Sequence, residues 1–99
     1  MNAPELAELN ESVLDAATLD ALVSDLQTHA DVLDVLVKGA ATQRTDGKPV
    51  PLTEAVEMMR AGSVRGVQVR YNWDGDEWRD TLFAVPGGVR LVRMKIDFR

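Results

Sequence analysis

The stretch RGVQVRYNWDGDEWRDTLFAVPGGVRLVRMKIDF, residues 65–98, decides the fold. It contains three segments in which apolar and polar side chains alternate, a pattern typical of strands with one buried face. Asp74-Gly75 separates the first two segments, and Pro86-Gly87-Gly88 separates the last two. Both are turn sequences. The sequence therefore predicts a three-stranded antiparallel meander over about 65–73, 78–85 and 89–98.

The lengths of the two turns predict the register of this meander. If Pro86-Gly87-Gly88 is a three-residue loop, Leu82 lies opposite Val92 and Trp78 lies opposite Ile96. Nearly all the bulky apolar side chains then share one face, and such agreement between turn chemistry and alternation favours this register. The predicted inner face consists of Val67, Val69, Tyr71, Trp73, Trp78, Asp80, Leu82, Ala84, Val92, Met94, Ile96 and Phe98.

Two amphipathic helices are predicted before the meander, and they would cover its apolar face. Apolar residues recur at helical spacing over 19–30, with Thr18 as the expected N-cap. A turn over 13–17, capped by Ser12, would precede this helix. Thr53 is expected to cap a second, short helix that stops at Gly62.

The remaining segments are less regular. Residues 32–38 are rich in β-branched side chains and predict a fourth strand, with a helix continuation as the alternative. The connection from there to the meander is long enough for parallel pairing. We expect residues 1–11 to be frayed and 39–51 to form a mobile loop. The prediction is a single α+β domain over 1–99, with two or three helices on one face of a three- to four-stranded sheet.

Composition limits the chemistry of the chain. It has 99 residues, a net charge of −5, no cysteine and one histidine, which excludes disulfides and thiolate catalysis. We expect no metal site and no cofactor.

Residues 1–59 carry three basic and eleven acidic side chains, and residues 60–99 carry eight basic and five acidic ones. We find no signal peptide and no apolar run that could span a bilayer, so we expect a soluble, cytoplasmic protein without a membrane partner.

The outer face of the predicted sheet is the candidate binding surface. In the predicted register it combines four cations with hydrogen-bonding side chains and one exposed aromatic ring. Such a face can bind an acidic protein, or single-stranded nucleic acid by charge and stacking. The simpler interpretation is an ordinary solvated face of an antiparallel sheet. The predicted surface consists of Gln68, Arg70, Asn72, Arg79, Phe83, Arg93 and Lys95.

Asp80 is the one residue that breaks the apolar pattern of the predicted inner face. A buried carboxylate beside Tyr71 is a candidate acid–base group. The structural alternative is a hydrogen bond to Tyr71 or to an arginine, because buried carboxylates are nearly always paired.

Three functional hypotheses follow. The first is a non-catalytic binding or accessory module that acts through a protein–protein surface, either with a protein partner or as a homodimer. The second is binding of single-stranded nucleic acid or a phosphorylated ligand on the basic face, which the acidity of the chain disfavours. The third is a small enzyme that uses Asp80 and Tyr71.

Overall fold

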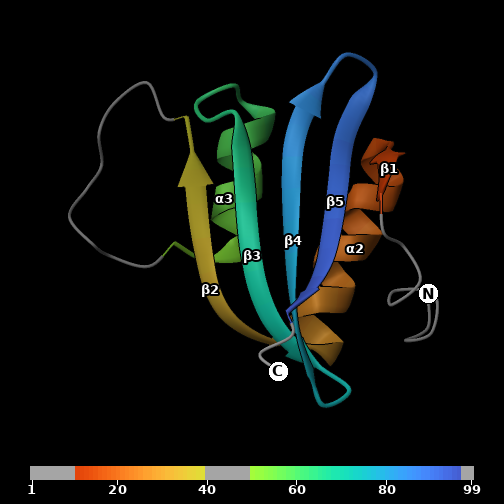
Figure 1. Ribbon diagram of the computed structural model, residues 1–99. Helices are drawn as coiled ribbons and strands as arrows, with labels where there is room; N and C mark the ends of the chain where they lie inside the picture. Colours follow the sequence, from red (N-terminus) through yellow and green to blue (C-terminus); the bar gives the residue numbers. More distant parts are fainter. Residues whose placement is uncertain (1–10, 40–49, 97–99) are drawn as a thin grey trace.

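The computed structural model describes residues 11–39 and 50–96, which form an α+β fold (Figure 1). Its sheet has five strands in the order β1-β5-β4-β3-β2, and every neighbouring pair is antiparallel. The elements are β1 (Glu11–Leu14), α2 (Ala16–His29), β2 (Asp31–Lys38), α3 (Leu52–Arg60), β3 (Gly66–Trp73), β4 (Asp76–Val85) and β5 (Gly88–Ile96).

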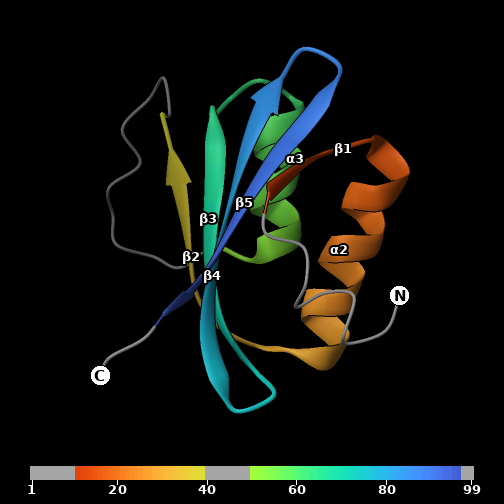
Figure 2. The same cartoon turned by 45° about the vertical axis from the view of Figure 1, so that its right-hand side comes forward.

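The two helices lie on the same side of the sheet, as the turned view shows (Figure 2). This confirms the predicted α+β class and the antiparallel meander of β3, β4 and β5. The sheet is larger than predicted, because β2 joins one edge and β1 the other. β2 pairs antiparallel with β3, not parallel as the length of the connection suggested. Neither of the two described helices is long and apolar enough to cross a membrane.

The start of the first helix differs from the prediction. Glu11–Leu14 is a strand, not a turn capped by Ser12. Asp15, not Thr18, caps α2: its carboxylate accepts a 2.8 Å hydrogen bond from the Thr18 N–H. This bond lowers the pKa of Asp15. Strand pairing with β5 explains the difference, because it keeps the chain extended up to Leu14, which is buried.

The second helix begins slightly earlier than predicted. Pro51 is the residue before α3, and Thr53 lies within the helix rather than at its cap. Pro51 is the N-cap residue and makes no side-chain capping hydrogen bond. The helix ends at Arg60, just before the predicted stop at Gly62, which has a positive φ of 82°. Residues 1–10, 40–49 and 97–99 lie outside the described part, and so do the predictions made for them, including that for Phe98.

The predicted register of the last hairpin is wrong. β4 and β5 are joined by a two-residue loop, Pro86-Gly87, with Val85 opposite Gly88. Gly88 therefore belongs to β5 and not to the turn. A Cβ atom on Gly88 would lie 2.4 Å from the carbonyl oxygen of Leu14, so this glycine is needed for the close approach of β1.

With the shorter loop, each side chain of β5 lies on the opposite face of the sheet from the one predicted. Leu82 lies opposite Leu91 instead of Val92. Leu91 is fully buried and Arg93 points into the core, whereas the side chain of Met94 is 54% exposed. A one-residue change in register moves every side chain of a strand to the other face. The buried core consists of Leu14, Leu19, Leu22, Val23, Leu26, Leu52, Ala55, Val56, Met59, Val64, Val67, Val69, Tyr71, Leu82 and Leu91.

Candidate functional site

The candidate site is the outer face of the sheet, the side opposite the two helices (Figures 1 and 2). Within residues 11–39 and 50–96, neither helix covers this face. The cross-strand pairs identify its members. They are Val13 on β1; Arg90, Val92, Met94 and Ile96 on β5; Glu77, Arg79, Thr81 and Phe83 on β4; Gln68, Arg70 and Asn72 on β3; and Asp34, Leu36 and Lys38 on β2.

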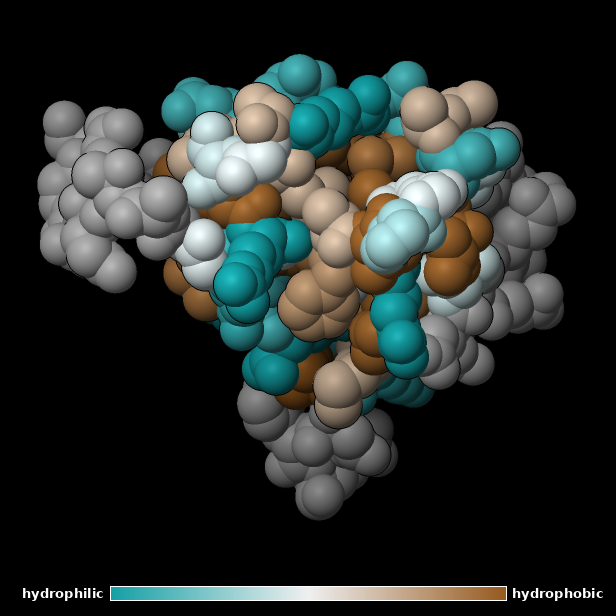
Figure 3. All heavy atoms as spheres, turned by 90° about the horizontal axis from the view of Figure 1, so that it is seen from above, coloured by the Kyte–Doolittle hydropathy of each residue, from teal (hydrophilic) through white to brown (hydrophobic). Residues whose placement is uncertain are grey.

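Four large apolar side chains of the outer face are exposed to solvent. The exposed fractions are 59% for Val13, 49% for Leu36, 39% for Phe83 and 54% for Met94. The Phe83 ring also covers Gly66 on the neighbouring strand, since a Cβ atom there would lie 3.2 Å from the ring. Phe83 therefore has a structural role as well. Apolar side chains also reach the surface at the end of the molecule that carries the β4–β5 turn (Figure 3).

The arginines of the outer face are not equivalent. Arg70 donates a 2.9 Å hydrogen bond from Nη1 to Oε2 of Glu77. Arg79 lies directly opposite Arg70 on β4, yet it forms no ion pair within the described residues. A hollow of about 160 Å³ is lined by both arginines together with Asp34, Leu36 and Gln68. Arg79 thus lines this hollow without an ion pair to any described residue.

The structure separates the residues of the predicted binding surface into two groups. Gln68, Arg70, Asn72, Arg79 and Phe83 lie on the outer face. Arg93 and Lys95 do not, because both belong to the alternate positions of β5, which face the helices.

Lys95 lies near the end of β5, where its Nζ is 3.5 Å from a carboxylate oxygen of Asp76. Several residues of the outer face were not predicted, among them Met94, Arg90 and Val13. Met94 and Arg90 were missed because of the assumed loop length, and Val13 because its segment was taken as a helical turn. A two-residue turn at Pro86-Gly87 would have identified the first two.

Arg93 forms a buried ion pair with Asp80 beneath the sheet. Its Nε donates to Oδ1 over 2.8 Å and its Nη2 donates to Oδ2 over 2.6 Å. Tyr71 donates a third hydrogen bond, 3.0 Å long, from its hydroxyl to Oδ1. The side chains of Asp80 and Arg93 are both fully buried. The expectation that the carboxylate of Asp80 is paired is therefore confirmed.

The buried cluster shifts the pKa of two of its members. Burial, followed by the negative charge of Asp80, raises the pKa of Tyr71 well above its usual range. Burial alone would lower the pKa of Arg93, but the hydrogen bonds and the charge of Asp80 outweigh it and raise that pKa. Both groups therefore hold their protons more firmly in the folded protein. Such a cluster orders the core by joining β3, β4 and β5.

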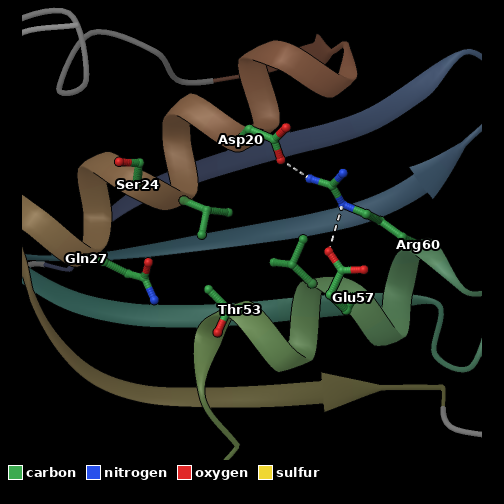
Figure 4. Close-up of a pocket in the computed structure, with 8 residues that line it drawn as sticks. Asp20, Ser24, Gln27, Thr53, Glu57 and Arg60 are labelled. Carbon is green, nitrogen blue, oxygen red and sulfur yellow. Dashed lines mark hydrogen bonds and ion pairs between the residues drawn. The ribbon is translucent and has the colours of Figure 1, made fainter.

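A groove between the two helices also carries several polar side chains (Figure 4). It measures about 180 Å³. Arg60 closes one end by pairing with Asp20 of α2, and its Nε lies 3.8 Å from Glu57. Val23 and Val56 belong to both the groove and the core. The groove is therefore the space between two packed helices, and the ion pair between Arg60 and Asp20 links the helices at one end. No group of three or more acidic or histidine side chains suited to a metal ion occurs among residues 11–39 and 50–96.

Comparisons with known proteins assign no family. No family model, curated protein or solved structure matches this chain. The function must therefore be argued from the surface of the molecule itself.

Proposed function

We propose that this chain is a non-catalytic binding module whose outer sheet face docks onto a protein partner. The observation that carries this proposal is the set of exposed apolar side chains on a sheet face that no described helix covers. Single exposed apolar residues are ordinary, but several on one face of a rigid sheet mark an interaction site.

The arrangement of these side chains supports a protein interface. Val13 lies opposite Arg90, and Arg90 lies opposite Phe83, so the three form one row across β1, β5 and β4. Met94 lies opposite Arg79 in a second row. Aromatic residues, methionine and arginine are enriched at the centres of protein interfaces, whereas lysine and acidic residues are depleted there.

The charges of the face indicate the chemistry of the partner. Arg79 lies beside the hollow and has no acidic partner within the described residues. An aspartate or glutamate from the partner would pair with it next to the apolar rows. The proposed partner therefore presents apolar side chains with at least one carboxylate at their border.

The two alternative functions find less support in the structure. A nucleic-acid surface loses Arg93 and Lys95 to the other face, while Glu77 and Asp34 contribute negative charge to the outer one. A catalytic role for Asp80 requires contact with a substrate, but this carboxylate is fully buried and both its oxygens accept hydrogen bonds.

Capture experiments with the full chain test the proposal. Met94→Glu and Arg79→Glu both change the second row of the outer face, and Gln27→Glu on the exposed surface of α2 is the matched control for added negative charge. We expect a specific partner to bind the wild-type chain and the control, and to be lost with both outer-face variants. Its capture should also weaken as salt is raised, because Arg79 contributes a charge pair. If both outer-face variants retain every captured protein, the proposal is wrong.

A further inference from the structure

β2 is an edge strand of the sheet that the described residues form. β2 has eight residues and pairs with β3 on one side only. No strand within residues 11–39 and 50–96 pairs with its other side. An edge strand presents a row of backbone N–H and C=O groups that another strand can complete.

The backbone groups that face this free edge belong to Val35 and Val37. The carbonyl oxygen of Lys38 accepts a 2.9 Å hydrogen bond from the Arg65 N–H, which precedes β3. The polar backbone groups of Lys38 therefore point towards β3. Successive residues of a strand point their backbone groups in opposite directions. Those of Leu36 thus also point towards β3, whereas those of Val35 and Val37 point outwards.

The side chains of the same segment show a symmetric pattern. Asp34, Leu36 and Lys38 lie on the outer face, with a negative charge, an apolar group and a positive charge in that order. The side chain of Leu36 is 49% exposed. Val35 and Val37 lie on the inner face, where they pack against the core. This order of charges is complementary to itself when the strand is reversed.

We propose that two copies of this chain associate through antiparallel pairing of their β2 strands about a two-fold axis at Leu36. Val35 of each copy would then exchange backbone hydrogen bonds with Val37 of the other. Asp34 of each copy would lie opposite Lys38 of the other, with the two Leu36 side chains between the charge pairs. The pairing joins two five-stranded sheets into one continuous sheet.

Two criteria favour this register over shifted ones: paired side chains must lie on the same face of the sheet, and paired charges must be opposite. A shift by one residue would place outer-face side chains opposite inner-face ones, which a continuous sheet does not allow. A shift that centres the axis on Val35 or Val37 keeps the facing. However, it places Leu36 opposite Asp34 or Lys38 and removes both charge pairs. The register centred on Leu36 alone combines the outward backbone groups with opposite charges.

This association shares Leu36 with the outer face but does not involve Met94 or Arg79, the residues whose variants test the proposed function. The outer faces of both copies would lie on the same side of the joined sheet, so a dimer would present two copies of the binding surface. Two linked sites raise the apparent affinity for a partner that can engage both.

Charge-reversal variants of the full chain test the pairing. Sedimentation over a range of protein concentrations should show dimers for the wild type. Lys38→Glu places two acidic side chains opposite each other on both sides of the axis, and we expect it to weaken association by roughly tenfold or more. Adding Asp34→Lys to this variant restores opposite charges and should restore the dimer. Lys95→Glu, on another strand and paired with Asp76, is the control and should leave the association unchanged.

Hydrogen exchange identifies the interface directly. The amides of Val35 and Val37 should become protected as the concentration rises, whereas the amide of Leu36, which faces β3, should be protected throughout. A wild-type chain that stays monomeric at high concentration overturns the proposal. A dimer that is unaffected by Lys38→Glu, or one that leaves Val35 and Val37 unprotected, overturns it as well. Met94→Glu should abolish partner capture without changing the dimer, which separates this test from that of the proposed function.

Discussion

The two faces of the sheet each carry an arginine–carboxylate pair between neighbouring residues of the meander, but in opposite surroundings. On the inner face, the side chains of Asp80 and Arg93 are both 0% exposed. On the outer face, Arg70 and Glu77 are 40% and 17% exposed. The distances are similar, at 2.6 and 2.9 Å. The difference in burial determines what each pair does for the protein.

The inner pair fixes the alignment of β4 and β5. Asp80 and Arg93 lie directly opposite each other, and Tyr71 from β3 completes the cluster. A slip of either strand would leave a charge buried without its partner, which costs several kcal/mol. The outer pair remains in contact with water and contributes little to stability. Its arginine lies on the surface that we propose for binding, beside Arg79.

Removal of the inner carboxylate is expected to give the largest effect on stability. Asp80→Ala leaves the guanidinium of Arg93 buried and unpaired, so we expect a loss of about 3–5 kcal/mol in the free energy of unfolding. Glu77→Ala is the matched change in the outer pair and should cost about 0–1 kcal/mol. Urea unfolding followed by circular dichroism measures both values.

A double variant distinguishes loss of a charge pair from loss of packing. Asp80→Leu combined with Arg93→Met replaces the buried pair with apolar side chains, and stability should recover much of the loss seen for Asp80→Ala. Equal losses for Asp80→Ala and Glu77→Ala would contradict the contrast between the two faces.

The next largest effect tests the orientation of β5. Leu91→Ala opens a cavity in the core and should cost about 2–5 kcal/mol, because Leu91 is fully buried. Met94→Ala, three residues later on the outer face, should change stability by only about 0.5 kcal/mol. Thermal and urea unfolding provide both numbers. The reverse order would mean that β5 follows the three-residue loop that the sequence had suggested.

The sequence predicts much of the fold because alternation and turn residues agree over the meander. It misses the orientation of β5, since Pro86-Gly87-Gly88 fits both a two- and a three-residue loop. β5 is also ambiguous by itself: Leu91 and Val92 are both apolar, so either face can be read as the buried one. The deciding contact is between Gly88 and the carbonyl of Leu14. It depends on a strand that is 74 residues away in sequence, and local patterns do not report it.

The candidate site was predicted only in part for the same reason. Arg70, Arg79 and Phe83 were placed on the correct face. The Asp74-Gly75 turn between β3 and β4 allows only one assignment of side chains to the two faces. Arg93 was misplaced together with its strand. The pairing of Asp80 with Tyr71 or an arginine was foreseen from the rule that buried carboxylates have partners. The identity of that arginine required the register.

A smaller loss than for Asp80→Ala or Leu91→Ala is expected on removing the hydroxyl of Tyr71. Tyr71→Phe removes one of the three hydrogen bonds to Asp80 and should cost about 1.5–3 kcal/mol, as expected for a bond to a charged group. It should also change how stability depends on pH. The folded protein raises the pKa of Tyr71 above the unfolded value of about 10, so it holds this proton more tightly than the unfolded chain does.

The stabilisation linked to that proton is complete below about pH 10 and is lost as the pH rises further towards the folded pKa. The wild type should therefore lose stability more steeply than Tyr71→Phe between about pH 10 and 12. All other ionisable groups are the same in both proteins, so the difference between the two isolates Tyr71. Because Tyr71 is the only tyrosine in the chain, ultraviolet absorbance of tyrosinate reports its ionisation directly. Ionisation near pH 10 while the protein is still folded would show that the hydroxyl is not enclosed with Asp80. The inner cluster would then be in contact with water, and the contrast with the outer face would not hold.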